Sequence, residues 1–177
     1  TPLYSSAASD VYKRQSVHIP DKIHTAVNPL LTASGMELAE MIRKRKVTSL
    51  EVVETHIDRI KRVNPTLNAV VKDRFDEARA EAKKADKKTK TTWPEKLPPF
   101  HGVPCTIKES FAFRGMPNTS GLVARKGIVG TRDATVVARL RKAGAIPLGV
   151  TNVPELCMWV ETYNRVYGRT RNPYDHR

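Results

Sequence analysis

The chain has 177 residues, and its 31 lysine and arginine residues against 18 aspartate and glutamate residues leave a formal net charge of +13. This length suits one domain or part of a larger one, and 40% hydrophobic residues can bury a core, which argues against wholesale disorder. No apolar run approaches the roughly 20 residues that span a bilayer, and no signal-peptide pattern opens the chain. Cys105 and Cys157 are the only thiols, so a disulfide framework is excluded and a reducing, intracellular compartment is expected.

The basic residues raise the question of nucleic-acid binding, because clustered lysine and arginine side chains neutralise phosphates. They form one group at 43–46 and a second along 79–90, where acidic residues dilute them and no aromatic residue recurs as a base-stacking platform. The pattern favours solvated helix faces, and no nucleic-acid partner is expected. The alternative is a non-catalytic basic fragment that binds a membrane surface, a partner or nucleic acid through Lys83 to Lys90.

The two ends of the chain indicate a fragment. Residues 1–15 resemble translated adapter or vector sequence, and the proline-containing residues 16–33 predict an extended arm. The chain begins with Thr1 and stops at Arg177, within a polar, loop-like run. We therefore expect both ends to be cuts within a longer protein.

Residues 34–90 carry local helix signals. Ser34 with Glu37 and Thr48 with Glu51 are spaced as capping boxes, and each precedes an apolar stripe of helical period. A proline ends the second stripe, and a third stripe of small apolar residues follows a short β-like run. The predicted helices run over 35–46, 49–64 and 74–88. The stripes of the first two helices predict that they pack against each other as an antiparallel pair.

Residues 100–177 change character, because Gly, Val, Ile and Ala rise and the lysine runs stop. The expected elements are a strand over 102–108, a long functional loop over 114–130, a helix capped by Asp133 and ended by Gly144, a second strand over 145–151 and a short helix over 155–160. A strand, a helix and a strand in succession predict a parallel crossover. We therefore expect the start of an α/β core, in a single domain that begins near residue 34.

Metal and nucleotide sites have no signature in the sequence. The histidines show no i, i+4 pair and no neighbouring cysteine pair, so they are expected at the surface rather than on zinc: His18, His24, His56, His101 and His176. Glycine-rich phosphate-binding patterns are also missing from the sequence. No cofactor is expected.

Lys108 is the residue whose position needs an explanation. It follows the apolar residues of the strand predicted over 102–108, where an ammonium group is costly to remove from water. Such a lysine must reach solvent, pair with an acid such as Glu109, or become neutral, and a neutral lysine can act as a base. Spacing alone leaves these three alternatives open.

Four blocks of the sequence together resemble the first part of the amidase signature family. They are HGVPCTIKES, GMPNTSG, DATVVARLRKAGAIPLGVTNVPEL and YGRTRNPYD, in the order and spacing of that family. Two further stretches, PLLTASGMELAEMIRKRKV and ELCMW, resemble the branch of the family that hydrolyses fatty-acid amides. The resemblance implies an α/β fold, a mixed twisted sheet covered by helices, of which this chain contains an incomplete start.

The resemblance also implies a mechanism. Catalysis in the family resembles a triad of a serine nucleophile, a cis-serine relay and a lysine, and the lysine of the GVPxxxK block corresponds to Lys108. Its implied role is that of general base through the relay serine, and later of proton source for the departing amine. An acyl-enzyme forms and water hydrolyses it.

Other residues carry over from the family by position. Met116, Thr119 and Ser120 fall in the loop beside the active site, where the resemblance implies that Thr119 and Ser120 orient the lysine or the relay serine. Leu156 and Cys157 fall where the acyl-binding side is expected, since soft apolar side chains suit a lipid tail. The implied substrate is a small, lipid-like amide.

Both family serines lie in glycine-rich segments after the NPYD turn, beyond Arg177. The chain as given is therefore expected to be catalytically silent, because residues that act as a unit do not work piecemeal. Membrane association would depend on an N-terminal segment that relatives carry and these residues lack. The acyl preference and the oligomeric state are left open.

Overall fold

The computed structural model of the chain describes residues 28–176. The adapter-like segment 1–15 and most of the predicted arm, 16–27, lie outside the described residues. The helices are α2 (Pro29–Thr32), α3 (Gly35–Arg43), α4 (Ser49–Leu67), α5 (Phe75–Thr91) and α6 (Thr135–Lys142), with single 3-10 turns at Pro94–Lys96, Val123–Arg125 and Glu155–Cys157. The strands are β1 (Val70–Asp73), β2 (Pro104–Lys108), β3 (Ile146–Thr151), β4 (Tyr163–Asn164) and β5 (Gly168–Arg169).

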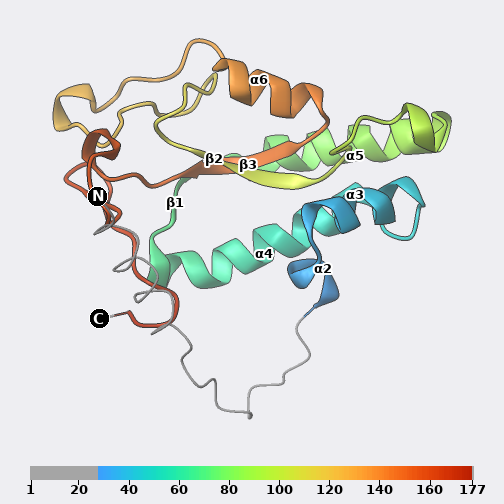
Figure 1. Ribbon diagram of the computed structural model, residues 1–177, viewed down its shortest axis with the longest axis horizontal. Coiled ribbons are helices and arrows are strands. Elements are labelled where there is room, and N and C mark those ends of the chain that lie inside the picture. The colour runs from blue at the N-terminus through green and yellow to red at the C-terminus, as the bar shows by residue number, and fades with distance from the viewer. Residues whose placement is uncertain (1–27, 177) are drawn as a thin grey trace, which may run out of the picture.

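A small mixed sheet forms the centre of the described residues. Its strand order is β1-β3-β2, in which β2 and β3 are parallel and β1 is antiparallel to β3. The chain leaves β2, passes through a long loop and α6, and returns as β3 (Figure 1). The parallel crossover and the mixed α/β class are therefore confirmed.

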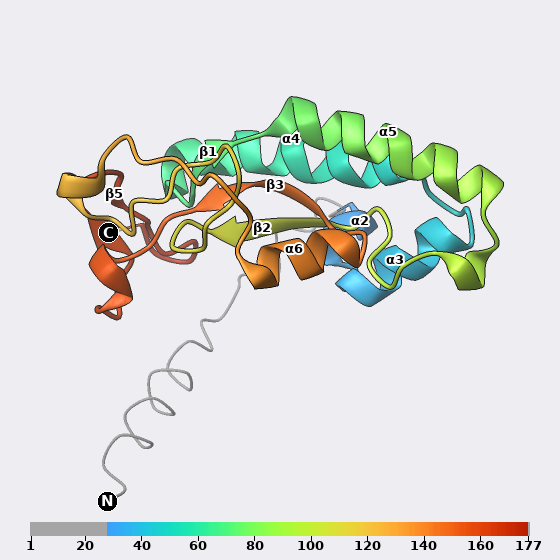
Figure 2. The same cartoon turned by 90° about the horizontal axis from the view of Figure 1, so that it is seen from above.

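Helices cover both faces of this sheet. Figures 1 and 2 show α6 on one side and the α4–α5 pair on the other. Ile146 and Leu148 of β3 pack against α4 and α5, whereas Val150 joins the cluster under α6. In a regular strand, residues 146, 148 and 150 would all face the same side of the sheet. A register shift between β2 and β3 explains why Val150 faces the other side, because one extra residue in a strand reverses the direction of the side chains that follow.

The helices begin largely where local chemistry predicts. The Ser34–Glu37 capping box is complete, with the Ser34 hydroxyl accepting from the Glu37 N–H at 3.2 Å and the Glu37 carboxylate accepting from the Ser34 N–H at 2.7 Å. The Thr48 hydroxyl accepts from the Glu51 N–H at 3.0 Å. Both predicted helix starts are confirmed.

The predicted end of α4 at Pro65 is wrong. The helix includes Pro65 and ends at Leu67, after which Asn68 adopts the left-handed conformation with φ 53°. The Asn64 side chain accepts from the N–H groups of Ala69 and Val70, at 2.8 Å each, and so directs the chain into β1.

The pairing of the first two predicted helices is also wrong. The long partner of α4 is α5, which runs antiparallel beside it and extends three residues beyond its expected end (Figure 2). Helix α3 contacts only the beginning of α4, where Leu38 and Ile42 share a cluster with Val52. The small face of α5, with Ala78 and Ala82, allows the close approach that the longer helix pair needs.

Three shorter predictions need correction. Within the predicted extended arm, Pro29–Thr32 form one helical turn, because the Asn28 side chain accepts from the Leu30 N–H at 3.0 Å. Asp133 does not cap α6, whose N-cap is Ala134; its carboxylate binds the Arg114 N–H and the Arg141 guanidinium instead. The helix predicted over 155–160 is only the turn Glu155–Cys157.

Of the histidines, His101 contradicts the expectation of a surface position. It is buried, and its Nε2 lies 2.9 Å from the Thr89 hydroxyl at the end of α5. Burial lowers the pKa of His101, so the neutral ring is favoured. His18 and His24 lie outside the described residues. Within 28–176, no helix has the length and apolar character that crossing a membrane requires.

Candidate active site

Lys108 occupies the carboxyl end of β2, directly beside the end of β3. Lys108 and Thr151 are register partners in the parallel pair, so the two strands present their last residues at one edge of the sheet. Carboxyl edges of parallel strands are where α/β proteins place functional groups. Within the described residues, the Lys108 amine has neither a hydrogen bond nor an ion pair.

The environment of Lys108 differs from the predicted apolar one. Its side chain is exposed, whereas Ile107 and Glu109 on either side are buried. Strand β2 is an edge strand of the sheet, so no described strand covers its outer side. Of the three alternatives for Lys108, contact with solvent is the one observed, and pairing with Glu109 is not.

Glu109 is the site residue that sequence reasoning missed. Its side chain is 0% exposed, and its carboxylate accepts four hydrogen bonds. Three reach one oxygen, from the Thr119 N–H at 2.5 Å, the Thr119 hydroxyl at 2.8 Å and the Tyr167 hydroxyl at 2.8 Å. The Ser120 N–H reaches the other at 2.8 Å. The strand alternation that places Cys105 and Ile107 inward extends to residue 109 and could have revealed this position.

The loop residues predicted for the site divide into two groups. Thr119 and Ser120 lie beside the end of β2, but they bind Glu109 rather than Lys108. Met116 is buried in the cluster that contains Ile107 and Phe113, so its side chain belongs to the core under α6. The structure therefore brings Thr119 and Ser120 close to the end of β2, and it gives Met116 a packing role.

Tyr167 lies at the rim of the site, and its hydroxyl donates a hydrogen bond to Glu109. Partial burial and the hydrogen bond to the Glu109 carboxylate raise the pKa of Tyr167 to about 12, because both favour the neutral phenol. The backbone N–H of Tyr167 donates to the Asn164 side chain at 2.7 Å. The amide of Asn164 in turn donates to Asn152, directly after β3, at 2.8 Å. A continuous polar network thus joins the β4–β5 hairpin to the ends of β2 and β3.

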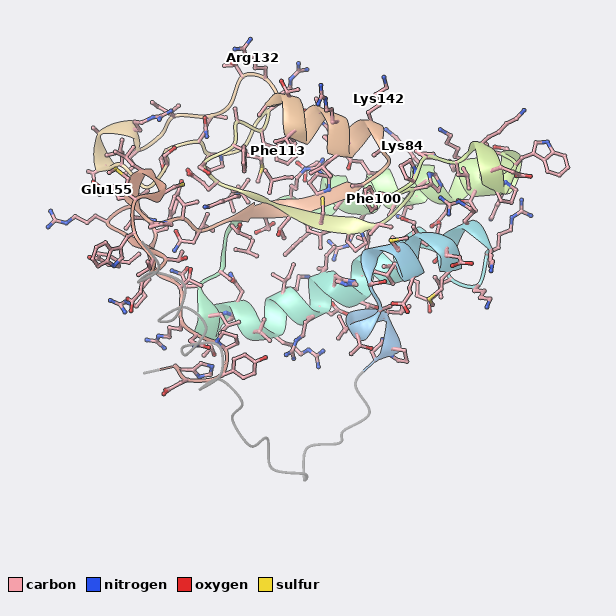
Figure 3. The ribbon with its side chains drawn as sticks, viewed as in Figure 1. Lys84, Phe100, Phe113, Arg132, Lys142 and Glu155 are labelled. Carbon is pink, nitrogen blue, oxygen red and sulfur yellow. The ribbon has the colours of Figure 1, made fainter. Side chains whose placement is uncertain are left out.

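Leu156 and Cys157 belong to an exposed apolar segment, residues 156–160, which has the sequence LCMWV. Trp159 is 70% exposed and Val160 is 93% exposed, so this segment contributes little to the core. Its link to the site is the Leu156 N–H, which donates to the Ser120 carbonyl at 2.8 Å. Figure 3 labels the neighbouring Glu155 at one end of the molecule, with Lys84 of α5 toward the other.

The basic residues of α5 face solvent, as the sequence predicts. Arg79 is the exception, because it forms ion pairs with Glu54 at 2.7 Å and with Asp76 at 2.9 Å. The lysine side chains of this helix are all exposed: Lys83, Lys84, Lys87, Lys88 and Lys90. Within the part of the chain that the structure describes, no three His, Cys, Asp or Glu side chains gather in a way that could hold a metal ion.

Comparison with known proteins shows the family to which the chain belongs. Residues 51–177 match the family model described as Amidase. The chain is 50% identical over 174 residues to fatty-acid amide hydrolase 2-A of Danio rerio, a match that covers 96% of the chain and 33% of the relative. It is 54% identical over 152 residues to fatty-acid amide hydrolase 2 of Homo sapiens, covering 83% of the chain and 29% of that protein. The chain thus spans about a third of the length of these curated relatives.

Solved structures of amidases have a similar fold. A bacterial aryl acylamidase of the amidase signature family superimposes with a TM-score of 0.77 at 32% identity, over 84% of this chain and 31% of that one. A structure of fatty acid amide hydrolase superimposes with a TM-score of 0.76 over 94% of this chain and 28% of that one, and at 24% identity it supports the fold alone. The expected start of the amidase signature fold is confirmed, and the chain belongs to the amidase signature family.

Proposed function

We propose that this chain supplies the lysine base of an amide-bond hydrolase that acts on fatty-acid amides. The observation that carries the proposal is the position of Lys108, whose amine lies at the carboxyl end of β2 without a hydrogen bond or an ion pair within the described residues. The amine is therefore open to a proton-transfer partner, and Glu109 does not form an ion pair with it because the Glu109 carboxylate accepts from four other donors.

The proposed reaction is acyl transfer to a serine. Lys108, in its uncharged form, accepts a proton from a relay serine, which accepts one from the nucleophilic serine as that oxygen attacks the amide carbonyl. The C–N bond then breaks, and the proton returns through the same relay to the departing amine. Water then hydrolyses the acyl-enzyme, and the lysine and the relay serine transfer protons a second time. Because the chain spans about a third of its relatives, we place both serines in the part that these residues do not include.

The substrate class rests on the apolar segment 156–160 and on the relatives. The exposed side chains of this segment lie next to the loop that borders the sheet edge, where an acyl chain would need an apolar surface. The relatives from Danio rerio and Homo sapiens are named as fatty-acid amide hydrolases. We therefore favour a long-chain amide over a short or purely polar one.

A chimaeric protein tests the proposal. The 177 residues replace the matched third of the Danio rerio relative, and hydrolysis of a long-chain primary amide and labelling by a fluorophosphonate probe are measured for the chimaera and for the chain alone. We expect turnover and labelling in the chimaera, and neither in the chain alone, because the proposal places both serines outside these residues. Turnover with labelling by the chain alone would refute the placement of the serines. A folded chimaera that carries the label but cleaves no long-chain amide would refute the substrate class.

A further inference from the structure

We propose that Glu109 is a positioning residue, which holds the apolar segment 156–160 at the edge of the sheet where Lys108 lies. The inference deepens the proposed function, on which the acyl-binding role of the segment rests. The hydrogen-bonded connection between Glu109 and the segment is a property of the described residues, and it can be tested without measuring turnover.

The first step is the way the loop closes around Glu109. The Asn118 side chain donates to the Glu109 backbone carbonyl at 3.0 Å, and the next two residues supply the N–H groups that bind the carboxylate. Ser120 and Gly121 both have positive φ, 52° and 75°, a local shape that lets the loop wrap around an anion. A buried carboxylate is costly unless charge-assisted hydrogen bonds surround it, so this loop conformation depends on Glu109.

The second step leads from the loop to the segment. Ser120 donates its N–H to Glu109 and accepts at its carbonyl from the Leu156 N–H, so one peptide links the carboxylate to the start of the segment. Gly121 packs directly against the same region, because a Cβ at this position would lie 3.1 Å from the Glu155 Cα and 2.9 Å from the Asn164 Cβ. This close approach leaves little freedom for the segment to shift while the loop stays in place.

The third step fixes the other end of the segment. Strand β4 begins at Tyr163, and the β4–β5 hairpin returns to the site through Tyr167, whose hydroxyl donates to the Glu109 carboxylate. Both flanks of residues 156–160 are therefore connected to one carboxylate. The side chains of the segment itself are exposed. Its placement therefore depends on the hydrogen bonds of the residues on either side of it, and not on burial of its own apolar groups.

Trp159 provides the measurement, since the chain has 2 tryptophans and a Trp93→Phe background leaves Trp159 alone. In that background Glu109→Gln keeps the shape of the side chain but directs an NH₂ group at the N–H groups of Thr119 or Ser120. We expect lower fluorescence anisotropy of Trp159, with the secondary structure retained by circular dichroism. The matched control is Asp58→Asn, which alters an exposed carboxylate on α4 away from the segment and should leave the anisotropy unchanged.

A second variant covers the case in which Glu109→Gln does not fold. Tyr167→Phe removes one of the four donors and should lower the anisotropy by a smaller amount, whereas Thr119→Ser keeps its hydroxyl and should leave the anisotropy as it is. Unchanged anisotropy in a folded Glu109→Gln chain refutes the positioning role. If that chain does not fold, unchanged anisotropy in Tyr167→Phe refutes it instead.

The chimaeric protein described above separates the two proposals. There, Glu109→Gln should raise KM for a long-chain amide by about fivefold or more, with a smaller change in kcat and little change in KM for a short-chain amide. Equal effects on both substrates would contradict a role in placing an acyl-binding segment. If Glu109→Gln lowers the Trp159 anisotropy but a folded chimaera without this substitution cleaves no amide, the positioning role of Glu109 stands and the proposed function alone is refuted.

Discussion

Lys108 and Glu109 are neighbours in the chain with opposite environments. The amine reaches solvent, while the carboxylate is fully buried and receives donors from the Thr119–Ser120 loop and from Tyr167. Strand alternation places them on opposite sides, and only the inward side offers enough N–H and O–H groups to replace water around a charge. The pair therefore combines one group that is open to solvent with one that is hydrogen-bonded to the surrounding loop.

Cys105, two residues before Ile107 in β2, gives a pH-dependent prediction. Burial raises the pKa of the Cys105 thiol from its ordinary value of about 9 to about 11. Between these values the unfolded chain has lost the proton and the folded chain has kept it. The stabilisation that Cys105 provides is therefore complete below pH 9, and the free energy of unfolding falls as the pH rises from 9 to 11.

Urea denaturation at a series of pH values checks this expectation. Cys105→Ala should flatten the decline between pH 9 and 11, and it should also lower stability at pH 8 through lost packing. The exposed Cys157→Ala is the matched control and should keep the full decline. An equally steep decline in Cys105→Ala would show that another group is responsible.

At the residue scale, sequence reasoning identified Lys108 but not its setting. The resemblance located the lysine by its block, and neither the block nor the hydropathy pattern indicated that the outer side of β2 is open. Glu109 was missed because an acidic residue after a strand reads as the beginning of a loop. Its four donors come from residues 10 to 58 positions later in the chain, which no local pattern brings together.

At the scale of elements, α5 adds a second cap to the N-terminus of α4, beside the one that Thr48 provides. The Asp86 carboxylate accepts from the N–H groups of Ser49 at 2.7 Å and of Leu50 at 3.1 Å, two of the donors that a helix start leaves unpaired. The negative charge also faces the positive end of the helix dipole. This cap joins the two long helices at the end opposite to β1.

We predict that Asp86→Ala lowers the free energy of unfolding by about 1–2 kcal/mol, the usual cost of a lost N-terminal cap. The urea midpoint should fall without a change in slope. Asp58→Ala, which removes an exposed carboxylate from α4, should shift stability by less than about 0.5 kcal/mol. Equal effects of the two substitutions would mean that the cap contributes nothing measurable.

The predicted elements were most accurate where the signal is local. The Ser34 capping box and the positive φ of Gly144 after α6 act through their own neighbours, and both are confirmed. The error at Pro65 arises from a side-chain interaction of Asn64 with the residues just after the helix, whereas the error at Asp133 arises where distant groups decide the outcome. Asp133 binds Arg114 and Arg141 instead of its own helix, and such partners become visible only once the sheet and α6 are assembled.

At the scale of the whole molecule, the positive charge and the candidate site are separate features. The lysines of α5 are exposed along one helix. The polar network around Glu109 lies at the carboxyl ends of β2 and β3, and the segment 156–160 lies at the same end of the molecule, where Figure 3 labels Glu155. The fold class followed from the alternation of helix and strand periods. The resemblance also implied that the sheet is incomplete, but it did not indicate that β2 is the strand left at the edge, because strand order depends on which distant strands pair.

The most direct test of the account is the effect of Lys108 on acylation in the chimaeric protein. We predict that Lys108→Ala slows fluorophosphonate labelling and long-chain amide hydrolysis by about 100-fold or more, the usual contribution of a general base. The matched control is Lys72→Ala, which removes another exposed strand lysine, from β1, and should leave both rates unchanged. Native rates in a folded Lys108→Ala chimaera would contradict the central claim.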